Sequence, residues 1–447
     1  MESCYPVRSF AAASVGTAGS AIAELATTLA GTPVSATADP TLSRAWFAGS
    51  FLPAGWETPS PWDALSRDYP CADGWIRLHT NAPHHRSAAL AVLGLPADAD
   101  AETAAPAVRP WKGEELEEAV VEAGGCAARM LTAEQWLSHP QGQAVAQEPL
   151  VGWSRRQPAA PVRSAGTSQR PLQGVRVLDL TRVIAGPVAT RFLAGFGAQV
   201  LRIDPPDWNE PALEPEMTVG KHCARLDLRS PQGAAKIREL IAGADIVVHG
   251  YRTGALAGLG LDEHRLQQLH PGIVTVAINA YGWTGPWRGR RGFDSLVQMS
   301  SGIADAGMAW STADTPRPLP VQALDHATGY LAAAAAVRAW TRRLDGEVHA
   351  ARLSLARTAA ELQRAADARA PVPPPWKSGP QSSESGRPAK TAQPPEEAPP
   401  PMTAEQTFWG PGQRLSPPLL FEPAGNSPRM TWEVPAAPLG SAAPKWR

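Results

Sequence analysis

The chain has 447 residues, of which 43% are hydrophobic and 19% are charged, and its formal net charge at pH 7 is −1. Because a single hydrophobic core rarely exceeds ~250 to 300 residues, we expect more than one domain. A near-neutral chain has no general attraction for nucleic acid or for an anionic membrane, and its apolar runs are far shorter than the ~20 residues that span a bilayer, so we expect neither partner.

The first residues, Met-Glu-Ser-Cys-Tyr-Pro, lack the basic and apolar regions of a secretory signal, so we expect a cytoplasmic protein. The four cysteines lie far apart and form no Cys-x-x-Cys pair, which argues against a zinc site and against a disulfide framework. The ten histidines show no metal-ligand spacing either. We therefore expect reduced thiols and no metal, and we expect His84 and His85, in a loop-like stretch, to face solvent.

Residues 1–153 contain scattered signals of secondary structure. An alanine-rich helix is predicted at 11–29, a strand at 74–78 and an acidic amphipathic helix at 113–123. Residues 154–170 are rich in Ala, Pro and Ser and have no periodicity, which predicts a linker.

Residues 171–365 alternate between strand and helix patterns. A strand-like run at 175–180 precedes a helix at 187–197, which has Pro at its start and Gly at its end, and a second strand follows at 199–203. The pattern continues with a helix at 231–242 and strands at 245–248 and 273–278. This repetition predicts an α/β fold with a doubly wound, mostly parallel, Rossmann-like sheet, accompanied by a smaller α+β domain.

Residues 366–401 are proline-rich and contain few large apolar groups, so we expect a disordered linker. The tail at 402–447 contains Trp409, Trp432 and Trp446. Exposed tryptophans reduce solubility, so we expect this tail to pack on the core.

The turn at 181–187 follows the first strand of the expected sheet, where a doubly wound fold presents backbone N–H groups to a nucleotide. Asp204, at the end of the second strand, is a candidate acidic partner. The turn lacks the three glycines of a dinucleotide fingerprint, so a nicotinamide cofactor is not expected. From spacing alone, the turn is equally compatible with an ordinary tight turn.

Asp325 stands immediately before an alanine-rich segment, 327–340, that is predicted to be helical. A carboxylate at this position can cap the helix, and the helix dipole would keep it ionised. An ionised carboxylate in a closed site can also attack an acyl carbon. Both roles, helix cap and nucleophile, are open at this point. A serine hydrolase is not expected, because no Gly-x-Ser-x-Gly elbow occurs.

The string at 171–182 (PLQGVRVLDLTR) opens a series of short motifs that follow in order over roughly 190 residues. The others are Ala185-Gly186-Pro187, 197–200, Lys221 with 226–228, 230–233, 244–248, Tyr251-Arg252, Gly254, 259–261, 282–286, 292–294, Gln298 and Ser301-Gly302. Together these motifs resemble CoA-transferase family III, the CaiB/BaiF type, and the string at 171–182 is similar to the start of the family's core.

The resemblance implies that Asp325 attacks an acyl-CoA to form a mixed anhydride and then an enzyme thioester, from which CoA passes to a free carboxylate. Acyl-CoA and the carboxylate would be the substrates, and no cofactor would be bound permanently. Binding of CoA would fall on residues at matching positions: Ile184, Ala185, Leu226 with Arg229, Gly250, Tyr251, Arg252 and Arg291. Family members commonly form homodimers, so a homodimer is possible here.

The sequence also departs from the family pattern. Gly258 stands where an arginine is common, Thr253 where proline is common, and Gly250 where asparagine is common. Phe293 replaces the histidine of the Gly-His-Asp motif that α-methylacyl-CoA racemases use for proton transfer, which favours transfer over racemisation. A racemase and a CoA-binding protein without turnover are the alternatives. Residues 1–153 resemble the segment that follows the core in this family, which implies a partial duplication or a permuted arrangement.

Overall fold

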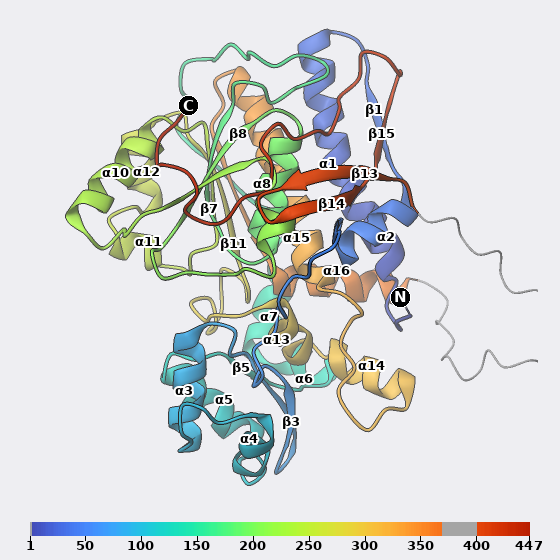
Figure 1. Ribbon diagram of the computed structural model, residues 1–447, viewed down its shortest axis with the longest axis vertical. Coiled ribbons are helices and arrows are strands. Elements are labelled where there is room, and N and C mark those ends of the chain that lie inside the picture. Colours follow the sequence, from blue (N-terminus) through green and yellow to red (C-terminus); the bar gives the residue numbers. More distant parts are fainter. Residues whose placement is uncertain (1, 369–399) are drawn as a thin grey trace, which may run out of the picture.

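The computed structural model describes residues 2–368 and 400–447. A seven-stranded sheet forms its centre (Figure 1). The strands lie in the order β6 (Gly152–Arg155), β12 (His349–Ser354), β11 (Val274–Asn279), β10 (Ile246–His249), β7 (Arg176–Leu180), β8 (Gln199–Asp204) and β9 (Lys221–Arg225). All neighbouring pairs are parallel except β12 with β6, which is antiparallel. The predicted α/β fold with a mostly parallel sheet is confirmed.

The order of the parallel strands locates a binding crevice. Counted along the chain from β7, they lie in the order 3-2-1-4-5-6, which is that of doubly wound nucleotide-binding sheets. The winding direction reverses between β7 and β10. In such sheets, ligands bind outside the carboxyl ends of the strands at this reversal.

Helices cover both faces of the sheet. α1 (Val7–Ala30), α8 (Ala185–Gly195) and α15 (Ala323–Leu344) contribute to one core, and α10 (Pro231–Ala242) and α12 (Glu263–Leu269) to the other. Successive side chains of a strand point to opposite faces, so Val177 of β7 lies in the first core and Leu178 in the second. This explains why the strands of the sheet are apolar along their whole length rather than at alternate positions.

A smaller α+β lobe lies below the sheet in Figure 1. Its three-stranded antiparallel sheet and three helices have a hydrophobic core of their own. The elements are β3 (Asp68–Cys71), β4 (Gly74–Leu78), α3 (Pro83–Leu93), α4 (Ala101–Val108), α5 (Gly113–Glu122) and β5 (Ala127–Arg129). We call residues 68–129 the N-terminal lobe.

Four helices connect the N-terminal lobe with the sheet: α6 (Ala133–Ser138), α7 (Pro140–Gln147), α13 (Asp294–Ser300) and α14 (Ile303–Ser311). Gln141 of α7 is fully buried. Its amide group donates to the carbonyl oxygens of Tyr281 and Thr284 at 2.7 and 2.9 Å, and its side-chain oxygen accepts the N–H of Trp287 at 2.6 Å. One side chain thus holds the loop that follows β11 in place.

Residues 402–447 pack against the N-terminal segment of the chain and against the helices of the central sheet. β14 (Gly410–Leu415) pairs with β13 (Met402–Thr407) and with β2 (Phe51–Pro53), while β15 (Leu419–Glu422) pairs with β1 (Ser35–Ala38). The ring of Trp432 stacks on Trp46 of α2 (Pro40–Ala48) at 5.9 Å between centroids. Trp446 donates its indole N–H to the carbonyl oxygen of Leu240 at 3.0 Å.

The structure describes one of the two expected linkers in full and the other only at its ends. Residues 369–399, most of the expected linker at 366–401, lie outside the described residues, and α16 (Leu355–Asp367) runs into its predicted start. The other expected linker, 154–170, begins within β6 and has no further helix or strand. The domain boundaries themselves stay a prediction.

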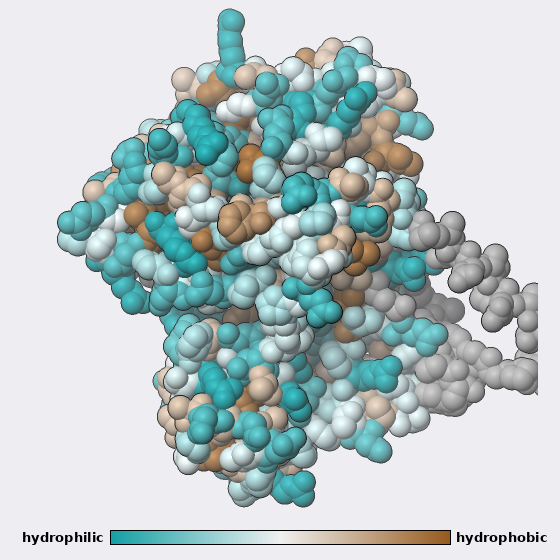
Figure 2. Space-filling model, in the orientation of Figure 1, coloured by the Kyte–Doolittle hydropathy of each residue, from teal (hydrophilic) through white to brown (hydrophobic). Residues whose placement is uncertain are grey.

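No helix in the described ranges is long and apolar enough to cross a bilayer. Figure 2 shows apolar residues in small separate groups among hydrophilic ones on the face in view. All four cysteines are free thiols.

Candidate active site

A cavity of ≈ 1170 Å³ opens at the carboxyl ends of the parallel strands. Residues at or just after the end of every parallel strand line it: Thr181, Asp204, Leu226, Gly250, Asn279 and Leu355. The cavity therefore occupies the crevice that the strand order predicts. Its volume slightly exceeds the usual range for small-molecule sites, about 300–1,000 Å³, which suits a long ligand.

The first turn after β7 is held from outside by Glu210. Val183 has a φ of 66°, which is unfavourable for a β-branched residue. Its N–H donates to the Glu210 carboxylate at 3.0 Å, and the same oxygen accepts the indole N–H of Trp208 at 3.0 Å. Glu210 is in turn paired with the buried Arg202. One carboxylate thus fixes both the turn and the Trp208 ring on the cavity wall.

Asp204 is not free for a ligand in this arrangement. Its side chain is fully buried, and its two oxygens accept bonds from the Arg202 guanidinium at 2.9 and 3.1 Å. The sequence-based suggestion of Asp204 as a partner for a nucleotide is therefore not supported. Its position at the end of β8 was foreseen, but its ion pair with a residue of the same strand was not.

A buried ion pair lies beneath the turn. Lys221 Nζ is 3.0 Å from the Asp179 carboxylate, and both side chains are fully inaccessible. Burial alone raises the pKa of Asp179, but Lys221 and Arg202 outweigh it and leave the pKa below its usual value. Asp179 also accepts the Thr181 N–H at 3.0 Å, so the ion pair anchors the start of the turn.

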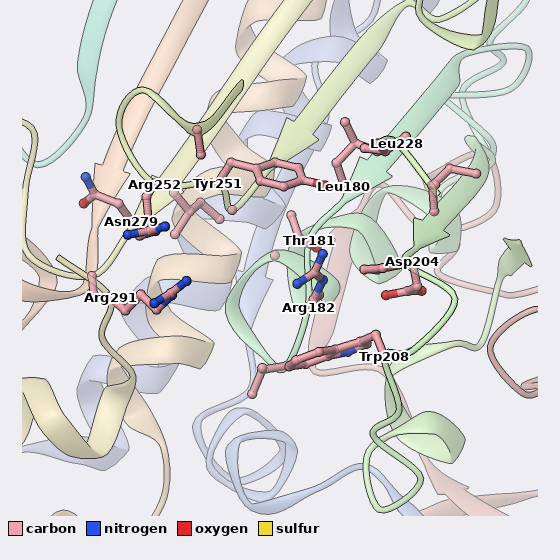
Figure 3. Close-up of a pocket in the computed structure, with 18 of the residues that line it drawn as sticks. Leu180, Thr181, Arg182, Asp204, Trp208, Leu228, Tyr251, Arg252, Asn279 and Arg291 are labelled. Atoms are coloured by element: carbon pink, nitrogen blue, oxygen red, sulfur yellow. The ribbon is translucent and has the colours of Figure 1, made fainter. Parts of the chain in front are cut away.

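One end of the cavity offers aromatic surfaces with a cation between them. The Arg182 guanidinium lies 4.9 Å from the ring centroid of Trp208 and 6.0 Å from that of Tyr251 (Figure 3). Rings placed in this way can stack on a flat heterocycle, and the cation suits a phosphate.

Seven of the eight residues predicted to contact CoA line this cavity. They are Ala185, Leu226, Arg229, Gly250, Tyr251, Arg252 and Arg291. Ile184 is not among the lining residues; it precedes α8 and packs against the main hydrophobic core. Whether the seven contact CoA stays a prediction, but the fold brings them to one cavity.

Asp325 also lines the cavity, but not as the expected helix cap. α15 begins at Ala323, so Asp325 lies in its first turn, and 7% of its surface is accessible. Burial raises the pKa of Asp325 well above its usual range, and the charge of Asp294 raises it further. Burial and Asp294 therefore oppose the ionisation that the helix dipole is expected to favour.

Asp294 takes the place of the missing cap. Its carboxylate accepts the Asp325 N–H at 2.9 Å, and burial raises its own pKa to about 6. Gln298 donates to Asp294 and accepts the N–H of Leu319 at 2.7 Å, which ties the segment before α15 to α13. The start of α15 is thus fixed from a helix distant in sequence.

Close packing of two helices places Asp325 near the first turn. Gly329 of α15 lies against α8, where an added Cβ would be 2.5 Å from the carbonyl oxygen of Ala185. Any larger residue at 329 would push the helices apart. The absence of a side chain at Gly329 therefore sets the distance between Asp325 and the strand ends.

The N-terminal lobe supplies residues of the cavity that the sequence did not reveal. Pro83, His84 and His85 of α3 line it, and His85 is only 3% accessible. The expectation of a loop with two solvent-facing histidines is wrong for His85, although His84 is exposed. No local pattern marks these residues, because only the fold brings α3 to the cavity.

Histidines also surround Phe293, the residue at the racemase histidine position. The ring of His79 stacks on Phe293 at 3.7 Å between centroids, and the ring of His85 lies edge-on at 5.9 Å. Burial lowers the pKa of both histidines to about 3, so both are neutral at physiological pH. Within the described ranges, no group of three or more His, Cys, Asp or Glu side chains could hold a metal.

Comparison with known proteins identifies relatives of this chain. A family model described as CoA-transferase family III matches residues 172–394. The chain is 30% identical to an acyl-CoA transferase of Gibberella moniliformis over 52% of this chain and 44% of that protein.

Two further relatives are 35% identical to the chain. One is a succinyl-CoA–D-citramalate CoA-transferase of Chloroflexus aurantiacus, with 30% of this chain and 37% of the relative aligned. The other is a succinyl-CoA:glutarate CoA-transferase of Mus musculus, with 30% and 34% aligned. The chain spans less than half the length of each of these three relatives.

Proposed function

The chain belongs to CoA-transferase family III through residues 172–394, and from this premise we propose that it transfers coenzyme A from an acyl-CoA to a free carboxylate, with Asp325 as the nucleophile. The observation that carries the proposal is the position of Asp325. It is a carboxyl group on the wall of a large cavity whose other end is built like a nucleotide site.

The proposed reaction proceeds through two kinds of covalent intermediate. The Asp325 carboxylate attacks the thioester carbonyl, which forms an acyl-aspartyl anhydride and expels the CoA thiolate. The thiolate attacks the aspartyl carbonyl, which releases the first acid as its carboxylate and leaves CoA as a thioester on Asp325. The acceptor carboxylate attacks this thioester, forms a second anhydride and expels the thiolate. The thiolate then attacks the acceptor's acyl carbon, which gives the new acyl-CoA and restores Asp325.

The remote end of the cavity supports this reaction through binding. Trp208, Arg182 and Tyr251 offer stacking surfaces and a cation, and the exposed Arg229 lines the same wall. A nucleotide handle bound there would hold the thioester at Asp325 and convert binding energy into orientation of the reacting groups.

The raised pKa of Asp325 bears on this chemistry. Only the ionised carboxylate attacks, so activity should fall as the pH decreases through that raised pKa. Once ionised, a carboxylate with a raised pKa is a stronger nucleophile than an ordinary one, because nucleophilicity rises with basicity.

The substrates are proposed from the relatives. Two of them are named for succinyl-CoA as donor and for carboxylic acids as acceptors. Succinyl-CoA with a labelled short dicarboxylic acid is therefore the pair that we propose to test first.

The test measures formation of the labelled acyl-CoA by the native chain, by Asp325→Ala and by Asp314→Ala, in which an exposed loop aspartate outside the cavity is replaced. We expect transfer by the native chain and the control, and none by Asp325→Ala. We also expect mass spectrometry to find CoA attached to the peptide that contains Asp325. Turnover by Asp325→Ala would refute the role of this residue. Transferase function itself would be refuted if the native chain bound acyl-CoA without transferring CoA. It would also be refuted if the native chain only exchanged the α-proton of the acyl group with solvent deuterium.

A further inference from the structure

One wall of the cavity comes from the N-terminal lobe, and the proposed reaction gives this wall no role. Pro83, His84 and His85, at the start of α3, line the cavity opposite the strand ends. They face a part of the cavity that also contains Arg252 and Arg291.

Two guanidinium groups meet at this place. Figure 3 shows the charged ends of Arg252 and Arg291 next to one another, away from Arg182 and Trp208. Arg291 donates to the carbonyl oxygen of Gly124, in the N-terminal lobe, at 3.0 Å. In the described part of the chain, neither arginine forms an ion pair with a carboxylate, and the Arg252 guanidinium has no hydrogen bond.

Arg290, next to Arg291 in the chain, does have a carboxylate partner. Arg290 is 2.7 Å from the buried carboxylate of Glu117 and also donates to the carbonyl oxygen of Ala127 at 2.8 Å. The fold therefore neutralises one of two adjacent arginines with an acidic residue of the N-terminal lobe and leaves Arg291 facing the cavity. Two adjacent like charges repel each other, and burial followed by Arg291 lowers the pKa of Arg252.

The start of α3 adds to the positive potential. Helix α3 begins without a side-chain cap, so its N-terminal end is not neutralised locally. His84 lies in this first turn, and burial followed by the charge of Arg291 lowers its pKa, which Asp207 offsets only in part. The adjacent His85 is nine-tenths buried at the cavity, and its Nδ1 atom has no hydrogen-bond partner.

The location relative to Asp325 follows from the chain itself. Arg291 is followed by Gly292, Phe293 and then Asp294, whose carboxylate accepts the Asp325 N–H. The cluster therefore lies toward the reacting end of the cavity. An anionic group held there would be close to the nucleophile.

We propose that His84 joins Arg252 and Arg291 in a subsite for the second carboxylate of a dicarboxylic acyl group, so that the N-terminal lobe takes part in substrate recognition. The proposal rests on the proposed function. It assigns to His84 a role in specificity, through contact with the bound carboxylate. A carboxylate offers the acceptor oxygens that guanidinium and imidazolium groups bind.

The experiment compares four thioesters in an Asp325→Ala background, in which no covalent intermediate forms. They are succinyl-CoA, propionyl-CoA, and the succinyl and propionyl thioesters of pantetheine, which carry no phosphate. Dissociation constants are measured by calorimetry before and after His84→Gln and Arg252→Gln. The controls are His264→Gln and Arg265→Gln, which replace the same residue types on the exposed side of α12.

We expect each substitution in the subsite to weaken binding of a succinyl ester about tenfold, which is the usual effect of losing one charged hydrogen bond. A loss for both succinyl esters but neither propionyl ester would support the proposal. A loss for both CoA esters but neither pantetheine ester would overturn it, because the group bound there would then be a phosphate of the coenzyme.

Affinities for the succinyl esters that His84→Gln and Arg252→Gln leave unchanged would likewise overturn the subsite. This outcome differs from failure of the proposed function. In that case succinyl-CoA would not bind to the Asp325→Ala protein even without the subsite substitutions, or the native chain would not catalyse transfer.

Discussion

The carboxylate of Asp294 accepts the backbone N–H of Asp325 at 2.9 Å, so two carboxyl groups share the buried start of α15. Burial raises the pKa of both groups, and the charge of Asp294 raises that of Asp325 further. Asp294 therefore does two things: it holds the backbone of Asp325 in place, and it disfavours ionisation of the side chain that we propose as the nucleophile.

Asp294→Asn separates these two effects. An asparagine side-chain oxygen can still accept the Asp325 N–H, but the negative charge is gone. We expect the acidic limb of the pH–rate profile for CoA transfer to move to lower pH, because Asp325 then ionises more easily. The change should appear in the position of this limb more than in KM for the acyl-CoA. An unchanged limb in a correctly folded Asp294→Asn protein would contradict the coupling, and Asp314→Asn serves as the control.

A second prediction concerns stability. Because the pKa of Asp325 is raised in the folded protein, its ionisation opposes folding: stability is highest below the ordinary carboxyl pKa and falls as the pH rises through the folded value. Asp325→Asn removes this ionisation. We expect it to increase the free energy of unfolding at neutral pH and to have little effect at low pH, as measured by urea denaturation at several pH values. If the effect of Asp325→Asn on the free energy of unfolding did not vary with pH, ionisation of Asp325 would not destabilise the folded protein.

The sequence predicted the sheet well because its signals are local. The helix at 231–242 was predicted with the bounds that α10 has, and the strand at 74–78 with those of β4. In both cases, turn residues or a capping serine mark the ends, and Ser230 accepts the Gly233 N–H at 3.0 Å. The start of α15 was misplaced because its capping group belongs to Asp294, which lies 31 residues away in the chain.

The candidate site could be predicted only where motifs of the family resemblance mark it. Leu226 and Arg252 were expected from that resemblance, and they line one cavity because they follow β9 and β10, parallel strands that end at the same edge. His84 and His85 could not be found in this way, since contacts between the N-terminal lobe and the sheet are not encoded in any local pattern. The sequence likewise gave no sign that Asp204 is bonded to Arg202.

Gln141 is predicted to be essential to the contact between α7 and the loop after β11. Gln141→Ala would leave the carbonyl oxygens of Tyr281 and Thr284 and the N–H of Trp287 without their partner. Each unsatisfied buried group costs about 1–3 kcal/mol, so we expect a loss of at least about 2 kcal/mol in the free energy of unfolding. Gln143→Ala is the matched control, because Gln143 is exposed on the same helix and should change stability by less than about 0.5 kcal/mol. Similar unfolding midpoints for both variants would refute the role of Gln141.

Gly258 offers a test of the nucleotide end of the cavity. It lies at the end of α11 (Ala255–Gly258) and lines the cavity, and an added Cβ would have no atom within 4 Å. An arginine can therefore be introduced without displacing a neighbour. We expect Gly258→Arg to bind CoA about fivefold more tightly, since one partly exposed charged contact with a phosphate contributes about 1 kcal/mol. Gly289→Arg is the control, because Gly289 is also unobstructed but lies outside the cavity lining. The gain in affinity should decrease at high salt, because salt screens exposed charges. If Gly258→Arg did not change the affinity for CoA, the phosphates of CoA would have to bind elsewhere.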